Sequence, residues 1–255
     1  MDLGLRDRVA LVTGASSGIG EAVALALAGE GARLALAARR EERLERVALD
    51  ARKAGAPDAR AFQADLSEPA SIADLVSRVQ SVYGHIDILI ANGGGPKAGT
   101  FLDLSMDDWD AGYRATLRSM LQLIDAVVPA MTAQGFGRIV ALTSTSVKQP
   151  IAHLALSNVF RTALVSALKT LSGEIASKGV TVNAIATGRV RTQRLLELYD
   201  SVEDVDRAAR AEVPIGRVAE PAEFAPMVVF LCSERAGYVT GQTIAVDGGL
   251  IKSLY

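Results

Sequence analysis

Seven short apolar runs alternate along this chain with longer segments whose apolar residues recur at helical spacing. Most of the runs are too short and too continuously apolar for amphipathic helices, and several end in glycine or a small polar residue, which is typical of buried parallel strands. Strands that alternate with helices form a parallel sheet with right-handed crossover connections. The runs are Val9–Gly14, Arg33–Arg39, Ala59–Asp65, Ile86–Gly93, Arg138–Ser144, Val180–Gly188 and Gln242–Gly249.

The intervening segments predict helices on both faces of that sheet. Two of them carry one apolar face at i, i+3, i+4, i+7 spacing. Two longer helices are predicted from about Ser105 to Thr132 and from about Leu154 to Ser177. The chain therefore predicts a single α/β domain over 1–255, with a doubly wound, Rossmann-type, seven-stranded parallel sheet. The apolar helical positions are Leu44, Val47, Ala48 and Ala51 in one shorter segment and Ile72, Leu75, Val76 and Val79 in the other.

Composition excludes several classes of protein. With 49% hydrophobic but only 5% aromatic residues, small aliphatic side chains suit helices packed closely on a sheet that is buried on both faces. A net charge of −2 with interspersed acids and bases argues against a nucleic-acid partner. The single cysteine, Cys232, excludes an internal disulfide and a cysteine-based metal cluster. Without a signal segment or an apolar stretch of ~18 residues, we expect a soluble, cytoplasmic protein with no membrane partner and no metal.

The first run leads into TGASSGIG, followed by a helical segment. Gly14 permits a tight turn, and Gly18 and Gly20 let the backbone approach a phosphate with no Cβ in the way. The helix that follows directs its free N–H groups at a pyrophosphate. A simple turn is the alternative, which the strand–loop–helix setting disfavours. The residues predicted to bind a dinucleotide here are Gly14, Ser16, Ser17, Gly18, Ile19 and Gly20.

The end of the second run predicts which dinucleotide is preferred. NAD-selective domains place an acidic residue there to bind the ribose 2′-hydroxyl, whereas this chain has Ala38, followed by Arg39 and Arg40. Guanidinium groups complement a phosphate dianion, which a carboxylate would repel. The alternative is a solvated start to the next helix. We favour NADP(H) as the cofactor.

TGASSGIG resembles the glycine-rich motif of the short-chain dehydrogenase/reductase family, and within that family the chain resembles 3-oxoacyl carrier-protein reductases. Further matches follow in the family's order along essentially the whole chain. Asp65 resembles the family's adenine-contacting aspartate, and Asn92-Gly93-Gly94 resembles its NAG stretch, altered to NGG. The segments KGVTVNAIATGRVRT and VTGQTIAVDGG resemble the sixth-strand region and the closing motif, although Thr187 replaces the family proline. The resemblance implies cofactor contacts for Asp65, Leu66, Asn92, Gly93, Gly94, Arg161, Gly188, Val190 and Thr192.

The resemblance breaks at the catalytic residues. The family uses an asparagine, a serine and a tyrosine-x-x-x-lysine pair. Ser144 matches the serine, but Ser157 stands at the tyrosine position, Arg161 at the lysine and Thr116 at the asparagine. A serine hydroxyl is a far weaker acid than a tyrosine beside a lysine, and an arginine stays charged at all relevant pH values. The implied proton-donor site is therefore altered, while the cofactor site is intact.

Three other side chains are candidates for the missing proton donor. No tyrosine lies between Tyr113 and Tyr199, so shifting the alignment with the family motif by a few residues does not bring a tyrosine to the position of Ser157. His153 lies four residues before Ser157, on the same face if the helix has already begun, and its imidazole titrates near neutral pH. Lys148 follows the fifth run, and Tyr199 could swing in with a mobile segment. Each also fits a surface or capping role.

The stretch 189–217 breaks the regular alternation, being long, charged and placed just after a strand end. Loops at that edge line the ligand crevice of such sheets, so we interpret the stretch as a substrate lid. A surface excursion without a role is the alternative. The two long helices and the closing segment QTIAVDGGLIKSLY carry surplus apolar positions and predict a homo-oligomer, a tetramer or a dimer.

Two functions follow from these residues. The first is a divergent NADP(H)-dependent short-chain oxidoreductase that converts a small carbonyl/alcohol pair with a rebuilt acid–base site, its candidate catalytic residues being Ser144, Ser157, Arg161, His153 and Lys148. The second is a catalytically degenerate dinucleotide-binding protein that acts as a sensor or as a partner subunit.

Overall fold

The predicted runs form one parallel sheet in the computed structural model of the chain, which describes residues 1–254. The strand order is β3-β2-β1-β4-β5-β6-β7, so the chain starts centrally, winds outward to one edge and returns to build the other. All seven strands are confirmed, with ends that differ from the prediction by three residues or fewer. They are β1 (Val9–Thr13), β2 (Arg33–Ala38), β3 (Ala59–Gln63), β4 (Ile88–Ala91), β5 (Gly137–Leu142), β6 (Val180–Thr187) and β7 (Thr243–Val246).

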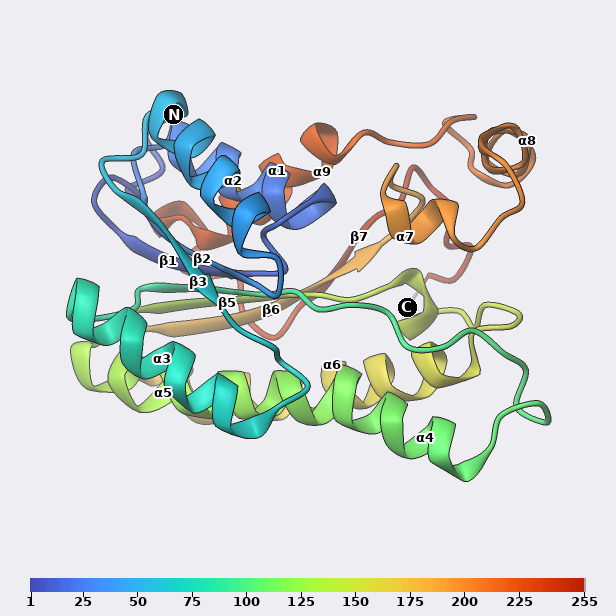
Figure 1. Ribbon diagram of the computed structural model, residues 1–255, viewed down its shortest axis with the longest axis horizontal. Coiled ribbons are helices and arrows are strands. Elements are labelled where there is room, and N and C mark those ends of the chain that lie inside the picture. Colours follow the sequence, from blue (N-terminus) through green and yellow to red (C-terminus); the bar gives the residue numbers. More distant parts are fainter. Residues whose placement is uncertain (255) are drawn as a thin grey trace.

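Helices cover both faces of the sheet, as predicted (Figure 1). One apolar core lies between the sheet and α1, α2 and α9, and a second lies between the sheet and α3, α5 and α6. Strands β1 and β5 are buried along their whole length, which explains their continuous apolar character. The helices are α1 (Gly18–Gly29), α2 (Glu41–Ala54), α3 (Pro69–Tyr83), α4 (Met106–Gly112), α5 (Ser119–Gln134), α6 (Ala155–Ile175), α7 (Gln193–Leu196), α8 (Val202–Glu212) and α9 (Pro221–Cys232).

The two shorter amphipathic segments fold as their spacing predicts, into α2 and α3. All eight predicted apolar positions are buried. Helix α3 begins at Pro69, whose fixed φ and missing N–H suit a first helical turn. Gly55 and Gly84 follow the two helices with positive φ angles of 124° and 82°, which favour glycine.

The predicted helix from Ser105 to Thr132 is a nearly continuous helix with an altered middle. It begins with a capping box, in which Ser105 Oγ accepts from the Asp108 backbone N–H and the Asp108 carboxylate accepts from the Ser105 N–H. Between α4 and α5 the chain winds as a π-helix (Tyr113–Arg118). Such turns occur frequently at functional sites. This one holds Thr116 in the interior, where its hydroxyl has no hydrogen-bond partner among residues 1–254.

The chain reverses its winding direction between β1 and β4, which opens a crevice at the carboxyl ends of the strands. The Thr13 hydroxyl links the end of β1 to the end of β4. It accepts from the Asn92 backbone N–H at 2.9 Å and donates to the Asn92 carbonyl oxygen at 2.7 Å. The loops that follow the two strands are therefore held beside each other, with the glycine loop on one side and the NGG stretch on the other.

Stretch 189–217 contains α7 and α8 and lies beyond the carboxyl ends of β6 and β7 (Figure 1). It has a small apolar cluster, formed by Val205, Ala209 and Val213 together with Val218, the residue that follows the stretch. Arg191 pairs within the stretch with Asp206 at 2.8 Å and ties it to the rest of the molecule by pairing with Glu220, before α9, at 2.9 Å. No helix within residues 1–254 is long and apolar enough to cross a membrane.

Candidate active site

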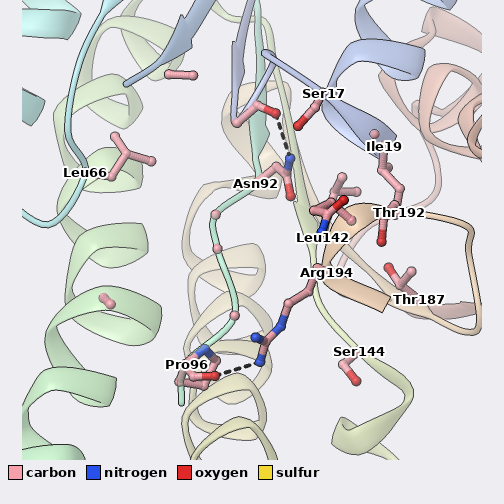
Figure 2. Close-up of a pocket in the computed structure, with 18 of the residues that line it drawn as sticks. Ser17, Ile19, Leu66, Asn92, Pro96, Leu142, Ser144, Thr187, Thr192 and Arg194 are labelled. Atoms are coloured by element: carbon pink, nitrogen blue, oxygen red, sulfur yellow. Dashed lines mark hydrogen bonds between the residues drawn. The ribbon is translucent and has the colours of Figure 1, made fainter. Parts of the chain in front are cut away.

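A cleft of about 570 Å³ lies at the switch point, at the carboxyl ends of the strands. The segments that follow β1 to β6 all contribute to its wall (Figure 2). Of the predicted cofactor residues, all except Gly20 line it. They are Gly14, Ser16, Ser17, Gly18, Ile19, Arg39, Arg40, Asp65, Leu66, Asn92, Gly93, Gly94, Arg161, Gly188, Val190 and Thr192.

The glycine loop after β1 is a cradle that side chains would fill. Gly14 and Gly18 both have φ of 61°. A Cβ on Gly14 would lie 2.6 Å from Asn92 Nδ2, and one on Gly18 would lie 3.2 Å from Thr192 Cγ2. Gly20 does not line the cleft, so a cofactor contact there stays a prediction, but the structure shows a packing reason for this glycine. A Cβ there would lie 2.2 Å from the Gly14 carbonyl oxygen, so glycine lets α1 start directly against the loop.

Four polar side chains gather where the end of β2 meets the loop after β1. Arg40 Nη2 donates to Ser16 Oγ at 3.1 Å and to Ser17 Oγ at 3.0 Å. Arg39, beside them, is exposed at the rim of the cleft. Neither arginine forms an ion pair with a carboxylate of residues 1–254. This cluster of two guanidinium groups and two hydroxyls therefore fits a phosphate group.

Asp65 is the one carboxylate among the described residues that line the cleft. Its Oδ1 accepts from the Ser67 backbone N–H at 2.9 Å and from the Ser67 hydroxyl at 2.8 Å. These bonds hold the pKa of Asp65 below its usual value. The carboxylate is therefore charged at neutral pH and can accept a hydrogen bond from a ligand.

The candidate catalytic residues Ser144, Ser157 and Arg161 meet at the other end of the cleft. Ser157, on α6, is buried, and its hydroxyl lies 3.4 Å from Ser146 Oγ. Ser144 Oγ accepts from the Ser146 backbone N–H at 3.1 Å. This end of the cleft therefore carries neighbouring hydroxyl groups, which can hydrogen-bond a substrate oxygen but are weak acids.

Arg161, also on α6, donates from Nη1 to the Leu142 carbonyl oxygen at 3.1 Å. No carboxylate of residues 1–254 pairs with it. Burial, together with the charge of Arg194, lowers the pKa of Arg161 to about 10. The guanidinium still carries its charge at neutral pH and cannot supply a proton there.

The other predicted donors lie away from this end. His153 precedes α6, which begins only at Ala155, so it does not share a helical face with Ser157. It is exposed, has φ of 59°, and lies outside the cleft wall. Lys148 is half-buried in the turn after β5 and is also absent from the wall. The Tyr199 hydroxyl accepts a hydrogen bond from Arg189.

Sequence reasoning missed Arg194 and the buried hydroxyl of Thr187. Arg194, on α7, reaches across the cleft and donates to the Pro96 carbonyl oxygen at 2.7 Å (Figure 2). It covers Gly95 so closely that a Cβ there would lie 2.6 Å from Arg194 Nε. Arg194 lies two residues after Thr192, a predicted cofactor residue, and this position was the sequence signal that could have indicated it. Thr187 lines the cleft, and its hydroxyl has no partner among the described residues.

Comparison with known proteins agrees with this geometry. A sequence profile of the family described as Enoyl-(Acyl carrier protein) reductase matches residues 14–251. The chain is 32% identical over 246 residues to dehydrogenase/reductase SDR family member 4 of Oryctolagus cuniculus, covering 96% of this chain and 94% of that protein. It is 32% identical over 245 residues to the 3-oxoacyl-acyl-carrier-protein reductase FabG of Escherichia coli K12, covering 95% and 97%.

Solved structures give the same result. L-sorbose reductase from Gluconobacter frateurii, complexed with NADPH and L-sorbose, has a TM-score of 0.94 and 33% identity, with 100% of both chains covered. YwfH, an NADPH-dependent reductase involved in bacilysin biosynthesis, has a TM-score of 0.93 and 30% identity, with 97% of this chain and 100% of the other covered. Since the profile and these relatives span nearly the whole chain, this protein belongs to the short-chain dehydrogenase/reductase family.

Proposed function

We propose that this protein is an NADP(H)-dependent oxidoreductase that acts on a small carbonyl/alcohol pair, with an acid–base site rebuilt around Ser157 and Arg161. The observation that carries the proposal is the cluster of Arg40, Ser16 and Ser17 at the end of β2, where an acidic residue would select NAD. The L-sorbose reductase and YwfH structures, both described with NADPH, support the same cofactor.

The cleft residues divide into two groups along its length. The cluster after β2 would hold the 2′-phosphate, the glycine loop and the start of α1 the pyrophosphate, and Asp65 the adenine end. When bound, the reduced cofactor supplies a hydride to a carbonyl carbon. At the opposite end Ser144 and Ser157 would hydrogen-bond the carbonyl oxygen, and Arg161 would stabilise negative charge on it. None of these three side chains releases a proton readily at neutral pH, so the proton that converts the alkoxide to the alcohol would come from solvent water.

One observation favours the second function, a dinucleotide-binding sensor or partner subunit. The titratable side chains in the described cleft wall are four arginines and Asp65, and no histidine, lysine, tyrosine or cysteine is among them. A protein that only binds a dinucleotide needs nothing more. Turnover separates the two functions, because only an oxidoreductase oxidises NADPH when a carbonyl compound is added.

We expect NADPH to bind at least about tenfold more tightly than NADH, because hydrogen bonds to a charged group each contribute about 1.5–3 kcal/mol. Calorimetric titration of both forms into the protein measures this directly. A panel of carbonyl compounds and alcohols, followed by absorbance of the reduced cofactor, then tests for turnover. Equal affinities for the two forms would contradict the assignment.

We also propose that 189–217 is the substrate lid. Its first helix, α7, carries Arg194, which lies over the loop after β4, and its second helix, α8, packs within the lid's own cluster. A segment with few apolar contacts to the main cores can move at low cost in free energy.

The oligomeric state remains a proposal, and we expect a homo-tetramer or a dimer. Phe101, Trp109 and Phe160 stack edge to face with centroids 5.4 and 5.7 Å apart, and Phe101 is 69% exposed. In this cluster Phe101, which precedes α4, is exposed, while Trp109 on α4 and Phe160 on α6 are half-buried, and such a cluster suits an interface between copies. The last residue of the closing segment, Tyr255, lies outside the described residues. Light scattering should give the mass of two or four protomers, and a monomer at micromolar concentration would contradict the proposal.

A further inference from the structure

Two arginines from different helices line the same cleft, and the charge of one acts on the other. Arg161 comes from α6 and Arg194 from α7, and both line the cleft. Each is anchored through a backbone carbonyl. Arg161 donates to that of Leu142 at 3.1 Å, and Arg194 donates to that of Pro96 at 2.7 Å (Figure 2). A guanidinium carries five N–H donors, so each anchor leaves donors available for a ligand.

The positive charge of this pair is hardly compensated. Among residues 1–254 no carboxylate pairs with Arg161, and Arg194 has only Glu197, whose side chain is 52% exposed and whose carboxylate lies 3.8 Å away. The charge of Arg194 contributes to lowering the pKa of Arg161, as expected for like charges that face each other. An anion bound between them would relieve this repulsion.

The phosphates of the cofactor have other partners. The 2′-phosphate is matched by Arg39, Arg40 and the two serines, and the pyrophosphate by the glycine loop and α1. Arg161 is instead anchored at the end of β5, next to the loop that carries Ser144. Asp65, the only carboxylate in the described cleft wall, is hydrogen-bonded to Ser67 and lies on a different segment from either arginine. Neither arginine is needed for these phosphates, so both have N–H donors for a negatively charged group that the substrate brings.

We propose that the substrate is a small oxo acid or hydroxy acid whose carboxylate is bound jointly by Arg161 and Arg194. This inference rests on the proposed oxidoreductase function. Planar guanidinium groups bind carboxylates through paired, charge-assisted hydrogen bonds, which also orient the ligand. The carboxylate contact would place the neighbouring carbonyl group toward Ser144 and Ser157. Because Arg194 belongs to the lid, the lid would close on the charged substrate.

The test uses protein saturated with NADP⁺, in which an oxo acid binds but cannot be reduced. Pyruvate, acetoacetate and levulinate, which differ in the spacing between carbonyl and carboxylate, are titrated by calorimetry beside their methyl esters. We expect at least one acid to bind tenfold or more tightly than its ester. Arg194→Met should weaken that acid by about 10- to 100-fold and leave the ester and NADP⁺ affinities unchanged. Arg207→Met is the matched control, since Arg207 lies on α8 with its side chain 75% exposed.

Each other outcome overturns the inference. Equal binding of acids and esters, or no binding of any acid at millimolar concentration, removes the carboxylate site while NADP⁺ binding keeps the proposed function. If Arg194→Met weakens NADP⁺ and does not change the ratio of acid to ester affinity, Arg194 serves the cofactor. If NADP⁺ itself does not bind to the native protein, the proposed function and this inference both fail at the first step.

Discussion

The double variant Ser157→Tyr/Arg161→Lys will reduce simple ketones and 3-oxoacyl compounds about 10²-fold faster than the native chain, which we expect to reduce them weakly or not at all. A positioned general acid contributes roughly 10²–10⁴-fold to such a reaction. The native pair lacks one, because a serine hydroxyl is a weak acid and Arg161 keeps its charge at neutral pH, even with its pKa lowered to about 10. A tyrosine beside a lysine supplies a proton donor where the carbonyl oxygen would lie.

The local geometry decides how large this gain becomes. Ser157 lines the cleft, so a longer side chain can extend into open space. We expect Thr116 to limit the gain, because it stands where the resemblance implies the family asparagine that helps organise the proton-relay water, and its own hydroxyl has no partner among the described residues. We therefore expect the lower end of the range.

Ser157→Phe/Arg161→Lys is the matched control, since it introduces the same ring without the hydroxyl. Rates of NADPH oxidation with each ketone, and calorimetric NADPH affinities, separate chemistry from cofactor binding. A Phe variant as fast as the Tyr variant would refute the general-acid explanation. If the native chain already turns over at roughly 1–10³ s⁻¹, the degenerate site is the wrong interpretation. His153→Ala and Lys148→Ala would then identify a donor, through loss of rate at unchanged cofactor affinity.

The double variant Arg39→Ala/Arg40→Ala should weaken NADPH binding by about 10²-fold or more. Its affinity for NADH should stay nearly unchanged. Each arginine would contribute charge-assisted hydrogen bonds to the 2′-phosphate, at about 1.5–3 kcal/mol each. NADH has no such phosphate, so its affinity does not depend on them. The Arg40 bonds to Ser16 and Ser17 show that this guanidinium already lies against the glycine loop.

Lys53→Ala is the control for charge alone. Lys53 lies at the far end of α2, is exposed and pairs with Asp50, so its removal takes away one positive charge, half of the change in the double variant, without touching the cleft. Calorimetric titration of NADPH and NADH into each variant gives the ratio directly. A preference for NADH in the native protein that survives the double substitution would refute the role of both arginines.

Apolar runs, helical spacing and glycine positions predicted most of this fold, because each depends on the burial or backbone conformation of neighbouring residues in the sequence. The seven apolar runs became the seven strands, since only a sheet buried on both faces tolerates such continuous apolar segments. The eight apolar positions of α2 and α3 are all buried, since helical spacing alone determines which side chains share a face. Gly14 and Gly18 were predictable for a similar reason, because positive φ and close approach require glycine.

Sequence patterns were less informative where a residue's role depends on where a helix begins or on which neighbours it contacts. His153 was assigned to a helical face on the assumption that α6 had begun, but the helix begins at Ala155 and the preceding turn leaves the imidazole exposed. For Gly20 the sequence indicated a role toward a ligand and not the close contact between α1 and the glycine loop that the structure shows. Helix limits and close packing both depend on neighbours that a linear pattern does not contain.

The sequence by itself determined the α/β class and the alternation of strands with helices, and it predicts the phosphate cradle and the altered pair at Ser157 and Arg161, because these depend on residue type and short-range spacing. Only the tertiary structure decided which distant side chains meet. Arg194 reaches Pro96 across 98 positions of sequence, and the cleft it shares with Arg161 exists only once α6 and α7 are placed against the same strand ends. The physical reason is that hydrogen bonds and charge interactions act over a few ångströms in space, whatever the separation along the chain.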